Sequence, residues 1–346
     1  MRKKQRLMSE SKQRIKWLDI AKGTGILLVV LGHCLDIEKC PFQIIFIFHM
    51  PLFFVLSGYV FKYNENFMLF LKKKFKSLIV PFIVFYILGL VVTLIVPVWR
   101  TELTWQGIGR DLWLADPNAV HNSSIWFLVC LFWVQILYWM IDKCKQWKKI
   151  LILVILATAG ILYSRQRYSF LGYTRLPFDL DVVPIACVFF AIGVYLKRKK
   201  LLDKICALNK YKIVILFGIS LTGIAIVYHY NGYVNLHGLS FGNPVLYFIG
   251  GILGSFSVIC ISVLIQMETK KVALIEKVML FYGKNSLIVL GIQSLLIRLY
   301  IIMMGVFGIE LGLYHFPIQH TLICFFLVAG ICCPIVCGVW TKCKKP

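Results

Sequence analysis

Charged side chains are scarce in this sequence, and their scarcity decides the class of protein. Only 15% of the 346 residues are Asp, Glu, Lys or Arg, while 60% are hydrophobic and the mean hydropathy is +0.80. A soluble domain carries roughly 25% charged residues, because it needs polar surface to cover its core. The composition therefore excludes an ordinary soluble protein and indicates that lipid surrounds most of the chain.

Several other signatures are missing. The sequence has no cysteine pairs at zinc-ligand spacing, no basic motif interleaved with aromatic residues, no internal repeat and no low-complexity linker. We therefore expect no nucleic-acid partner, no metal site and no additional soluble domain. The twelve cysteines lie mostly within apolar runs, where a thiol behaves as a small hydrophobic group. Cys34 and Cys40 both approach the same end of the predicted helices. The sequence therefore allows a disulfide between them but does not require it.

Continuous apolar runs recur along the whole chain, and alternating segments typical of membrane strands do not. A helix of about 20 residues crosses ~30 Å of hydrocarbon. We predict an all-α, polytopic integral membrane protein with about ten transmembrane helices. The predicted spans are 17–36, 42–61, 77–98, 124–141, 149–164, 180–196, 212–229, 244–266, 285–304 and 317–340. The first run carries three polar side chains and lacks a cleavage site, so it is not expected to be a signal peptide.

Basic residues predict the orientation of these spans. Thirty of the 38 Lys and Arg residues fall in the N-terminal arm, the C-terminal tail and every second loop, six fall in the other loops and two lie within spans. Loops rich in Lys and Arg stay in the cytoplasm, so both termini are expected there. The division is then a basic arm (1–16), a ten-helix domain (17–341) and a short basic tail (342–346). The net charge of +23 is explained by basic loops beside anionic lipid, in a cell membrane for which the bacterial cytoplasmic membrane is expected.

The first span places three ionisable side chains on one stripe. Lys22 and His33 are eleven residues apart, which leaves them about 20° apart around a helix, and Asp19 falls about 40° from His33. Charged residues within a span usually face a cavity or a partner, because lipid solvates them poorly. We expect a polar cavity here, and the i,i+3 spacing allows an ion pair between Asp19 and Lys22. The alternative is that Lys22 reaches the interface and His33 only bonds a neighbouring helix.

The second span contributes another histidine at similar depth. His49 lies about one and a half turns from the start of this span and is followed by Pro51, which bends a helix or frees a carbonyl group. His33 and His49 are therefore predicted to share a site, with Ser57 further along. A packed core histidine is the competing interpretation for His49.

These residues resemble a known family. The spacing Lys22-x10-His33, followed by Phe48-His49-Met50-Pro51-Leu52-Phe53-Phe54-Val55-Leu56-Ser57-Gly58, is similar to the acyltransferase-3 family of membrane O-acyltransferases, and the fucose 4-O-acetylase-like branch is the most similar part of it. Three weaker segments also fit: Asp19-Ile-Ala-Lys22-Gly23, Ser124-Ile-Trp126-Phe127-Leu128 and Gly283-Lys-Asn285-Ser286-Leu287. The chain has Lys22 where much of the family has Arg, and Gln293 where relatives often have His. Because Gln cannot transfer a proton, no acid or base role is assigned to position 293.

The resemblance implies an enzyme that moves an acyl group, usually acetyl, from cytoplasmic acyl-CoA to a hydroxyl of an extracytoplasmic or lipid-linked envelope carbohydrate. Acetyl-CoA is then a co-substrate, and no permanently bound cofactor is expected. In this reading His33 is the general base or a transient acyl carrier, Lys22 binds the donor, and Asp19 orients Lys22. His49 and Ser57 shape the site. The oligomeric state is left undetermined.

Further candidates for donor or acceptor binding have competing explanations. Trp126 offers a flat surface for a sugar ring, or belongs to the interfacial aromatic belt. Arg165, Arg167 and Arg175 are predicted either to bind an anionic acceptor or to contact lipid headgroups. Asn285 is included because it lies in a segment of the family resemblance. Arg298 falls in the middle of the ninth span and is expected to face the cavity, with Asp179 or Asp181 as its partner.

Two other classes of protein compete with the enzyme. Intramembrane Asp, Lys and His are also found in transporters, so a transporter or flippase of a glycan or small solute is the alternative. Against it, the sequence shows no inverted repeat and no matching pair of broken helices. A sensor or scaffold with an inactive site is the third class, which Gln293 keeps open.

Overall fold

The computed structural model describes residues 14–166, 173–268 and 272–343, and within these residues it is helical, with isolated bridges in place of strands. The predicted all-α fold is confirmed, since ten helical segments are long and apolar enough to cross a membrane. They are α2 (Lys16–Cys34), α3 (Cys40–Tyr59), the run α4, η1 and α5 (Phe67–Lys74, Phe75–Ile79 and Val80–Ile95), η2 with α8 (Ser123–Ile125 and Trp126–Ile141), α9 (Gln146–Gln166), η3 with α10 (Pro177–Asp179 and Val183–Arg198), α12 (Lys210–Asn231), α13 (Pro244–Met267), α14 (Ala273–Val306), and the run α15, η4 and α16 (Ile318–Phe325, Phe326–Cys332 and Cys333–Cys343).

Two spans begin at least ten residues earlier than the sequence predicted. The third segment starts at Phe67 instead of 77, because Asn66 caps it by accepting a hydrogen bond from the backbone N–H of Leu69 at 3.0 Å. The ninth starts at Ala273 instead of 285 and includes charged residues. Apolar patterning marks only the part of a helix that lipid surrounds, so a helix that continues beyond it is underestimated.

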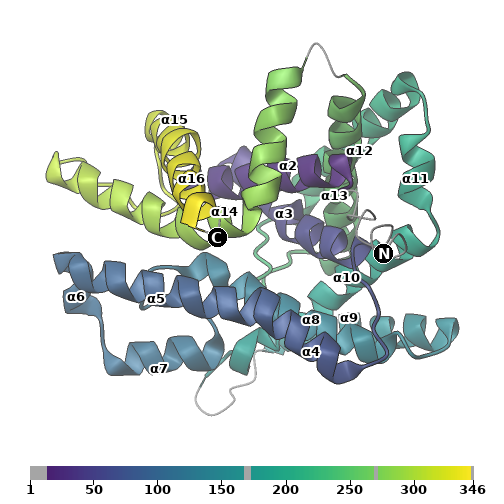
Figure 1. Ribbon diagram of the computed structural model, residues 1–346, viewed down its shortest axis with the longest axis horizontal. Helices are drawn as coiled ribbons and strands as arrows, with labels where there is room; N and C mark the ends of the chain where they lie inside the picture. Colours follow the sequence, from purple (N-terminus) through teal and green to yellow (C-terminus); the bar gives the residue numbers. More distant parts are fainter. Residues whose placement is uncertain (1–13, 167–172, 269–271, 344–346) are drawn as a thin grey trace, which may run out of the picture.

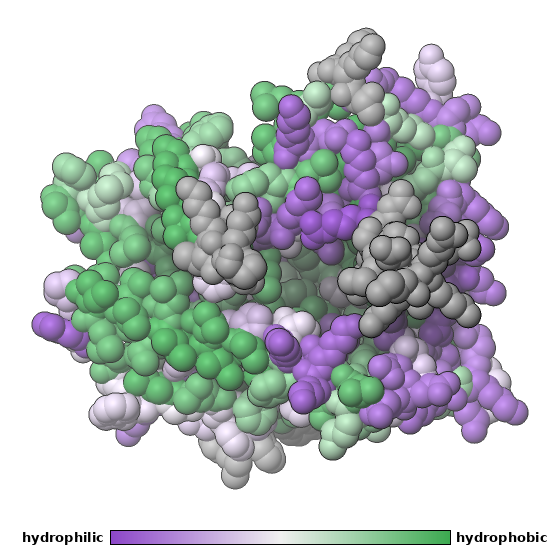
Figure 2. All heavy atoms as spheres, viewed as in Figure 1, coloured by the Kyte–Doolittle hydropathy of each residue, from purple (hydrophilic) through white to green (hydrophobic). Residues whose placement is uncertain are grey.

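Short helices mark the two ends of the bundle (Figure 1). The helix α11 (Leu201–Cys206) and the first described residues lie at one end, and α6 (Pro97–Glu102) and α7 (Trp105–Leu114) lie at the other. Hydrophilic side chains gather on the side of α11, while a broad hydrophobic surface covers the rest of this view (Figure 2). We call the end with α11 the basic end and the end with α6 and α7 the opposite end. That the basic end is cytoplasmic stays a prediction.

The helix α2 lies near the centre of the fold and packs on α3, α13 and α14, while α3 also packs on α10. Glycine makes one of these crossings possible. A Cβ atom on Gly23 would lie 1.9 Å from the carbonyl oxygen of Met279, and one on Gly283 would lie 1.8 Å from that of Asp19. The backbones of α2 and α14 therefore touch, and this contact fixes the part of α2 that carries Lys22.

Candidate active site

Three cavities follow one another along α2 and α3. The basic mouth, at the basic end, encloses about 830 Å³, the middle cavity about 220 Å³ and the histidine cavity about 80 Å³. Lys22 lines both the basic mouth and the middle cavity. Val29, Met50 and Leu290 line both the middle cavity and the histidine cavity. These shared residues place the three cavities in one series, which runs from the basic end toward the opposite end.

The basic mouth concentrates positive charge. Its lining contains one acidic residue, Asp19, and six basic ones: Arg14, Lys22, Lys62, Lys73, Lys74 and Lys197. Lys197 donates a hydrogen bond to the hydroxyl of Tyr59 at 3.4 Å, and that hydroxyl donates in turn to Asp203 at 3.1 Å. A concave surface lined by one sign of charge attracts ligands of the other sign. The basic mouth is therefore suited to a polyanionic group.

The predicted ion pair between Asp19 and Lys22 is wrong. Asp19 pairs with Arg14, whose Nε lies 3.5 Å from its carboxylate, and no ion pair joins Asp19 to Lys22 in the part of the chain that the structure describes. Arg14 lies just before α2 and reaches back to the carboxylate in its first turn. Lys22 is thereby left without a carboxylate partner, at the boundary between the basic mouth and the middle cavity.

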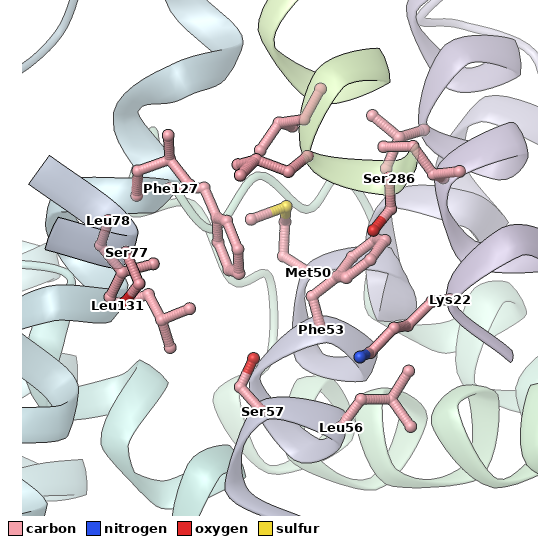
Figure 3. A pocket seen from close by; sticks show the side chains of 15 residues that line it. Lys22, Met50, Phe53, Leu56, Ser57, Ser77, Leu78, Phe127, Leu131 and Ser286 are labelled. Atoms are coloured by element: carbon pink, nitrogen blue, oxygen red, sulfur yellow. The ribbon is translucent and has the colours of Figure 1, made fainter. Parts of the chain in front are cut away.

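The middle cavity is mostly apolar (Figure 3). Its polar lining consists of Lys22, Ser57, Ser77 and Ser286, and the amine of Lys22 lies at the end where Ser57 is found. The remaining lining residues are Ile26, Val29, Met50, Phe53, Leu56, Leu78, Phe127, Leu128, Leu131, Leu287 and Leu290. Such a lining suits a flexible chain with few polar atoms, entered past one cation.

His33 and His49 line the same cavity, as the sequence predicted. Nδ1 of His33 lies 2.8 Å from the hydroxyl of Tyr314. Nδ1 of His49 lies 2.9 Å from the carbonyl oxygen of Ile45. Because a carbonyl oxygen can only accept, Nδ1 of His49 carries the hydrogen, and Nε2 is the acceptor in the neutral ring. Two imidazoles with oriented rings therefore meet one small cavity, about 16 Å from Lys22 by the rise of α2.

Tyr314 is held in an unusual backbone conformation. Its φ is +63°, in the left-handed region that bulky residues rarely adopt, and its carbonyl oxygen accepts a hydrogen bond from Ile37 N–H at 2.8 Å. Burial raises the pKa of Tyr314 to about 12, so the phenol stays neutral near pH 7. A strained residue bonded to a candidate catalytic group is typical of functional sites.

Trp126 lies against a second aromatic ring in the wall of the histidine cavity. His237, from the loop between α12 and α13, stacks on its indole with centroids 4.5 Å apart and an interplanar angle of 16°. Nε2 of His237 lies 3.2 Å from Asp179, and burial lowers the pKa of His237 to about 4. One face of Trp126 is therefore covered by a neutral imidazole, which limits the indole surface that the sequence suggested for a sugar.

Arg175 binds two aspartates within the protein. Its guanidinium donates to Asp181 at 2.6 and 3.2 Å and to Asp179 at 3.0 Å. The expected pairing of Arg298 with Asp179 or Asp181 is therefore wrong, because both carboxylates bind Arg175. Nε and Nη2 of Arg175 are thus engaged by carboxylates of the protein, and these bonds hold the wall that carries Asp179.

The other predicted residues divide between the cavities and the rest of the bundle. Ser57 lines the middle cavity, whereas Arg165 is exposed at the end of α9 and Arg167 lies outside the described residues. Asn285 donates to the carbonyl oxygen of Phe281 in its own helix at 2.9 Å, and its neighbour Ser286 lines the middle cavity in its place.

Gln293 has a clear structural task. It is fully buried on α14, and its amide donates to the hydroxyl of Ser124 at 2.5 Å. This contact joins α14 to the start of the fourth span, beside the wall of the histidine cavity to which Ser124 belongs. The side chain is thus a bridge between two helices.

Sequence reasoning missed two residues of the histidine cavity, Tyr314 and His237. Both come from loops at the opposite end, and Tyr314 is 281 residues from its partner His33. Neither belongs to a periodic pattern or to a motif. Within the described ranges, no three His, Cys, Asp or Glu side chains gather as a metal site requires.

Comparison with known proteins decides the family. Residues 15–339 match the family model described as an acyltransferase domain, the third of that name. The chain belongs to the acyltransferase-3 family. No curated protein and no solved structure matches the chain. The match includes both helices that carry Lys22, His33 and His49, so the three cavities lie within the acyltransferase domain of an integral membrane protein.

Proposed function

We propose that the protein is an O-acyltransferase of the fucose 4-O-acetylase-like branch. It moves an acyl group, acetyl in the simplest case, from cytoplasmic acyl-CoA to a hydroxyl of an extracytoplasmic or lipid-linked envelope carbohydrate. The observation that carries this proposal is the series of cavities, which leads from a basic mouth past Lys22 to a pair of histidines. Each cavity suits a different part of the reaction.

The order of the cavities matches the parts of an acyl-CoA molecule. Its phosphorylated nucleotide is a polyanion, and the basic mouth supplies six cationic side chains in a bundle end that the charge pattern assigns to the cytoplasm. Its pantetheine arm is long, flexible and uncharged, which suits the apolar middle cavity. The thioester at the end of the arm would then reach the histidine cavity, and Lys22 would bind the donor where the first two cavities meet.

The two histidines supply the proton transfer that the reaction needs. When Nδ1 of His33 donates to Tyr314, its Nε2 is free to take the proton of an acceptor hydroxyl. The hydroxyl oxygen forms an ester bond to the acyl carbon, the carbon–sulfur bond of the thioester breaks, and the departing CoA thiolate takes up the proton. In the alternative route His33 Nε2 first carries the acyl group and passes it to the hydroxyl. His49 lies in the same cavity, with its Nε2 available to orient either reactant.

The test uses the purified full-length protein in nanodiscs with radiolabelled acetyl-CoA. Wild type is compared with Lys22→Ala, His33→Ala and the control His229→Ala, whose ring is exposed at the end of α12. We expect wild type and the control to bind the donor and to transfer label to host glycan. Lys22→Ala should weaken donor binding, whereas His33→Ala should bind the donor and transfer nothing.

Each competing class gives a different outcome. A folded wild-type protein that neither binds nor consumes acyl-CoA would overturn the proposal and favour the transporter or flippase. If wild type and His33→Ala both bind the donor and neither transfers label, the protein is a scaffold with an inactive site. Loss of transfer only on changing His33 supports the enzyme.

A further inference from the structure

Arg298 is a partly buried arginine of a membrane-spanning helix that lacks a partner among the described residues, whereas Arg165, at the end of α9, is exposed. It makes no hydrogen bond or ion pair in the described part of the chain, and its Nε is buried. By contrast, Arg175 pairs with two aspartates and Arg198 pairs with Asp142. A guanidinium within a spanning helix is costly unless something neutralises it, so Arg298 calls for an anion that the described residues do not supply.

The nearest acidic side chain does not fill this role. Glu102, on α6, interacts with Arg298 through space only, and its closest basic contact is Nε2 of His121 at 3.4 Å. The Glu102 side chain is 62% exposed, so water competes for its charge. His121 cannot neutralise Arg298 either, because an imidazole is neutral or cationic and carries no negative charge.

Arg298 lies beside the candidate site of transfer. Its charge acts on Tyr314, which is the hydrogen-bond partner of His33 in the histidine cavity. Arg298 follows Leu290, which lines that cavity, by eight residues, or about 12 Å along α14 toward the opposite end. A ligand entering from the opposite end would therefore meet Arg298 before its hydroxyl reaches His33.

We propose that Arg298 binds an acidic group, a carboxylate or a phosphate, of the carbohydrate acceptor. This inference rests on the proposed acyltransferase function and narrows its acceptor to an anionic glycan. The planar guanidinium donates two parallel hydrogen bonds to a carboxylate or phosphate, a geometry that Lys cannot reproduce. Binding the acid at Arg298 fixes the distance between the acidic group and the hydroxyl that is acylated, so the site selects the sugar as well as its charge.

The test separates host glycans by anion exchange into a neutral and an acidic pool and offers each pool to the protein in nanodiscs with radiolabelled acetyl-CoA. We expect label in the acidic pool. Arg298→Gln should lower this transfer at least about tenfold, since a hydrogen bond to a charged group is lost, and leave donor binding unchanged. Arg298→Lys should restore part of the transfer. The control Arg110→Gln removes an exposed charge on α7 and should match wild type.

Several outcomes would overturn the inference. The first is equal labelling of the neutral and acidic pools, and the second is transfer at the wild-type level by Arg298→Gln. The third is that the loss of transfer in Arg298→Gln disappears when anionic lipids are omitted, which would make Arg298 a contact for lipid headgroups. If Arg298→Gln does not fold, two measurements still test the inference: the transfer activity of Arg298→Lys, and whether the wild-type protein labels the acidic or the neutral pool. Carboxylate blocking and phosphatase treatment of the acidic pool tell which acid is bound.

A binding measurement separates this inference from the proposed function. Immobilised wild-type protein should retard the acidic pool without any donor, and immobilised Arg298→Gln should not. If acyl-CoA is neither bound nor consumed while this retardation is seen, the acyltransferase proposal fails and the anion site stands. If donor turnover is seen without retardation or selective labelling, the anion site fails and the acyltransferase stands.

Discussion

Replacing Tyr314 by Phe isolates the contribution of one hydroxyl group to the reaction. The hydroxyl lies 2.8 Å from His33 Nδ1, while the ring packs edge-on against Phe42 and Phe46, contacts that Phe keeps. The imidazole becomes cationic when it takes the acceptor proton, and a hydrogen bond to a charged group contributes about 1.5–3 kcal/mol. Since about 1.4 kcal/mol corresponds to a factor of ten in rate, kcat should fall roughly 10- to 100-fold.

Steady-state transfer of radiolabelled acetyl groups in nanodiscs measures this effect. The KM for acyl-CoA should change little, because the nucleotide and Lys22 are about 16 Å away along α2. The same chain offers a matched control. The hydroxyl of Tyr300 lies 2.9 Å from Nδ1 of His320, outside the lining of the histidine cavity. Tyr300→Phe thus removes the same kind of bond and should leave kcat unchanged.

Two results would refute this reasoning. A Tyr314→Phe protein with the kcat of wild type would show that the hydroxyl does not act on the reacting imidazole. An equal loss in both variants would show that kcat responds to packing in general. Size-exclusion profiles and melting temperatures of the two variants check that each remains folded.

Three further variants test the architecture around the site. Gly283→Ala should lower the melting temperature strongly and weaken donor binding, because its Cβ would meet the carbonyl oxygen of Asp19 at 1.8 Å, whereas Gly305→Ala, with nothing within 4 Å, should be neutral by the same measurements. Leu290→Trp fills the junction between the middle cavity and the histidine cavity, so acyl transfer should fall at least about tenfold. Binding of adenosine 3′,5′-bisphosphate, the nucleotide end of CoA, should be retained. Loss of both transfer and nucleotide binding would contradict the order of the cavities. Arg175→Gln should cost about 3–5 kcal/mol of stability in a denaturation experiment, since it leaves two buried carboxylates unpaired, and an unchanged stability would show that this pair is not structural.

The number of helices and the face of α2 that lines the cavities could be predicted from the sequence. Both depend on patterns along one segment: runs of about 20 apolar residues, and the helical period that aligns Lys22 with His33. The structure confirms the ten helices and places both side chains in the series of cavities. Local patterns of this kind survive folding, because lipid enforces them directly.

Which basic side chain pairs with which carboxylate could not be predicted in the same way. Asp19 has Lys22 at a favourable helical spacing, yet Arg14, just before the helix, pairs with it. Asp179 and Asp181 are the partners that the sequence suggests for Arg298. Arg175 lies four residues before Asp179 and six before Asp181, and it binds both carboxylates. In each case an arginine that is close in sequence forms the ion pair, and helical spacing alone does not identify it.

The apolar lining of the middle cavity has an electrical consequence. A membrane at 100 mV stores about 2.3 kcal/mol for each elementary charge that crosses it, and any continuous column of water through a protein would let ions dissipate that energy. Apolar side chains such as Val29, Met50 and Leu290, which line both the middle cavity and the histidine cavity, repel water and hinder the passage of hydrated ions. An uncharged thioester arm can occupy such a passage. The fold therefore suits the proposed transfer between two compartments while the membrane remains an insulator.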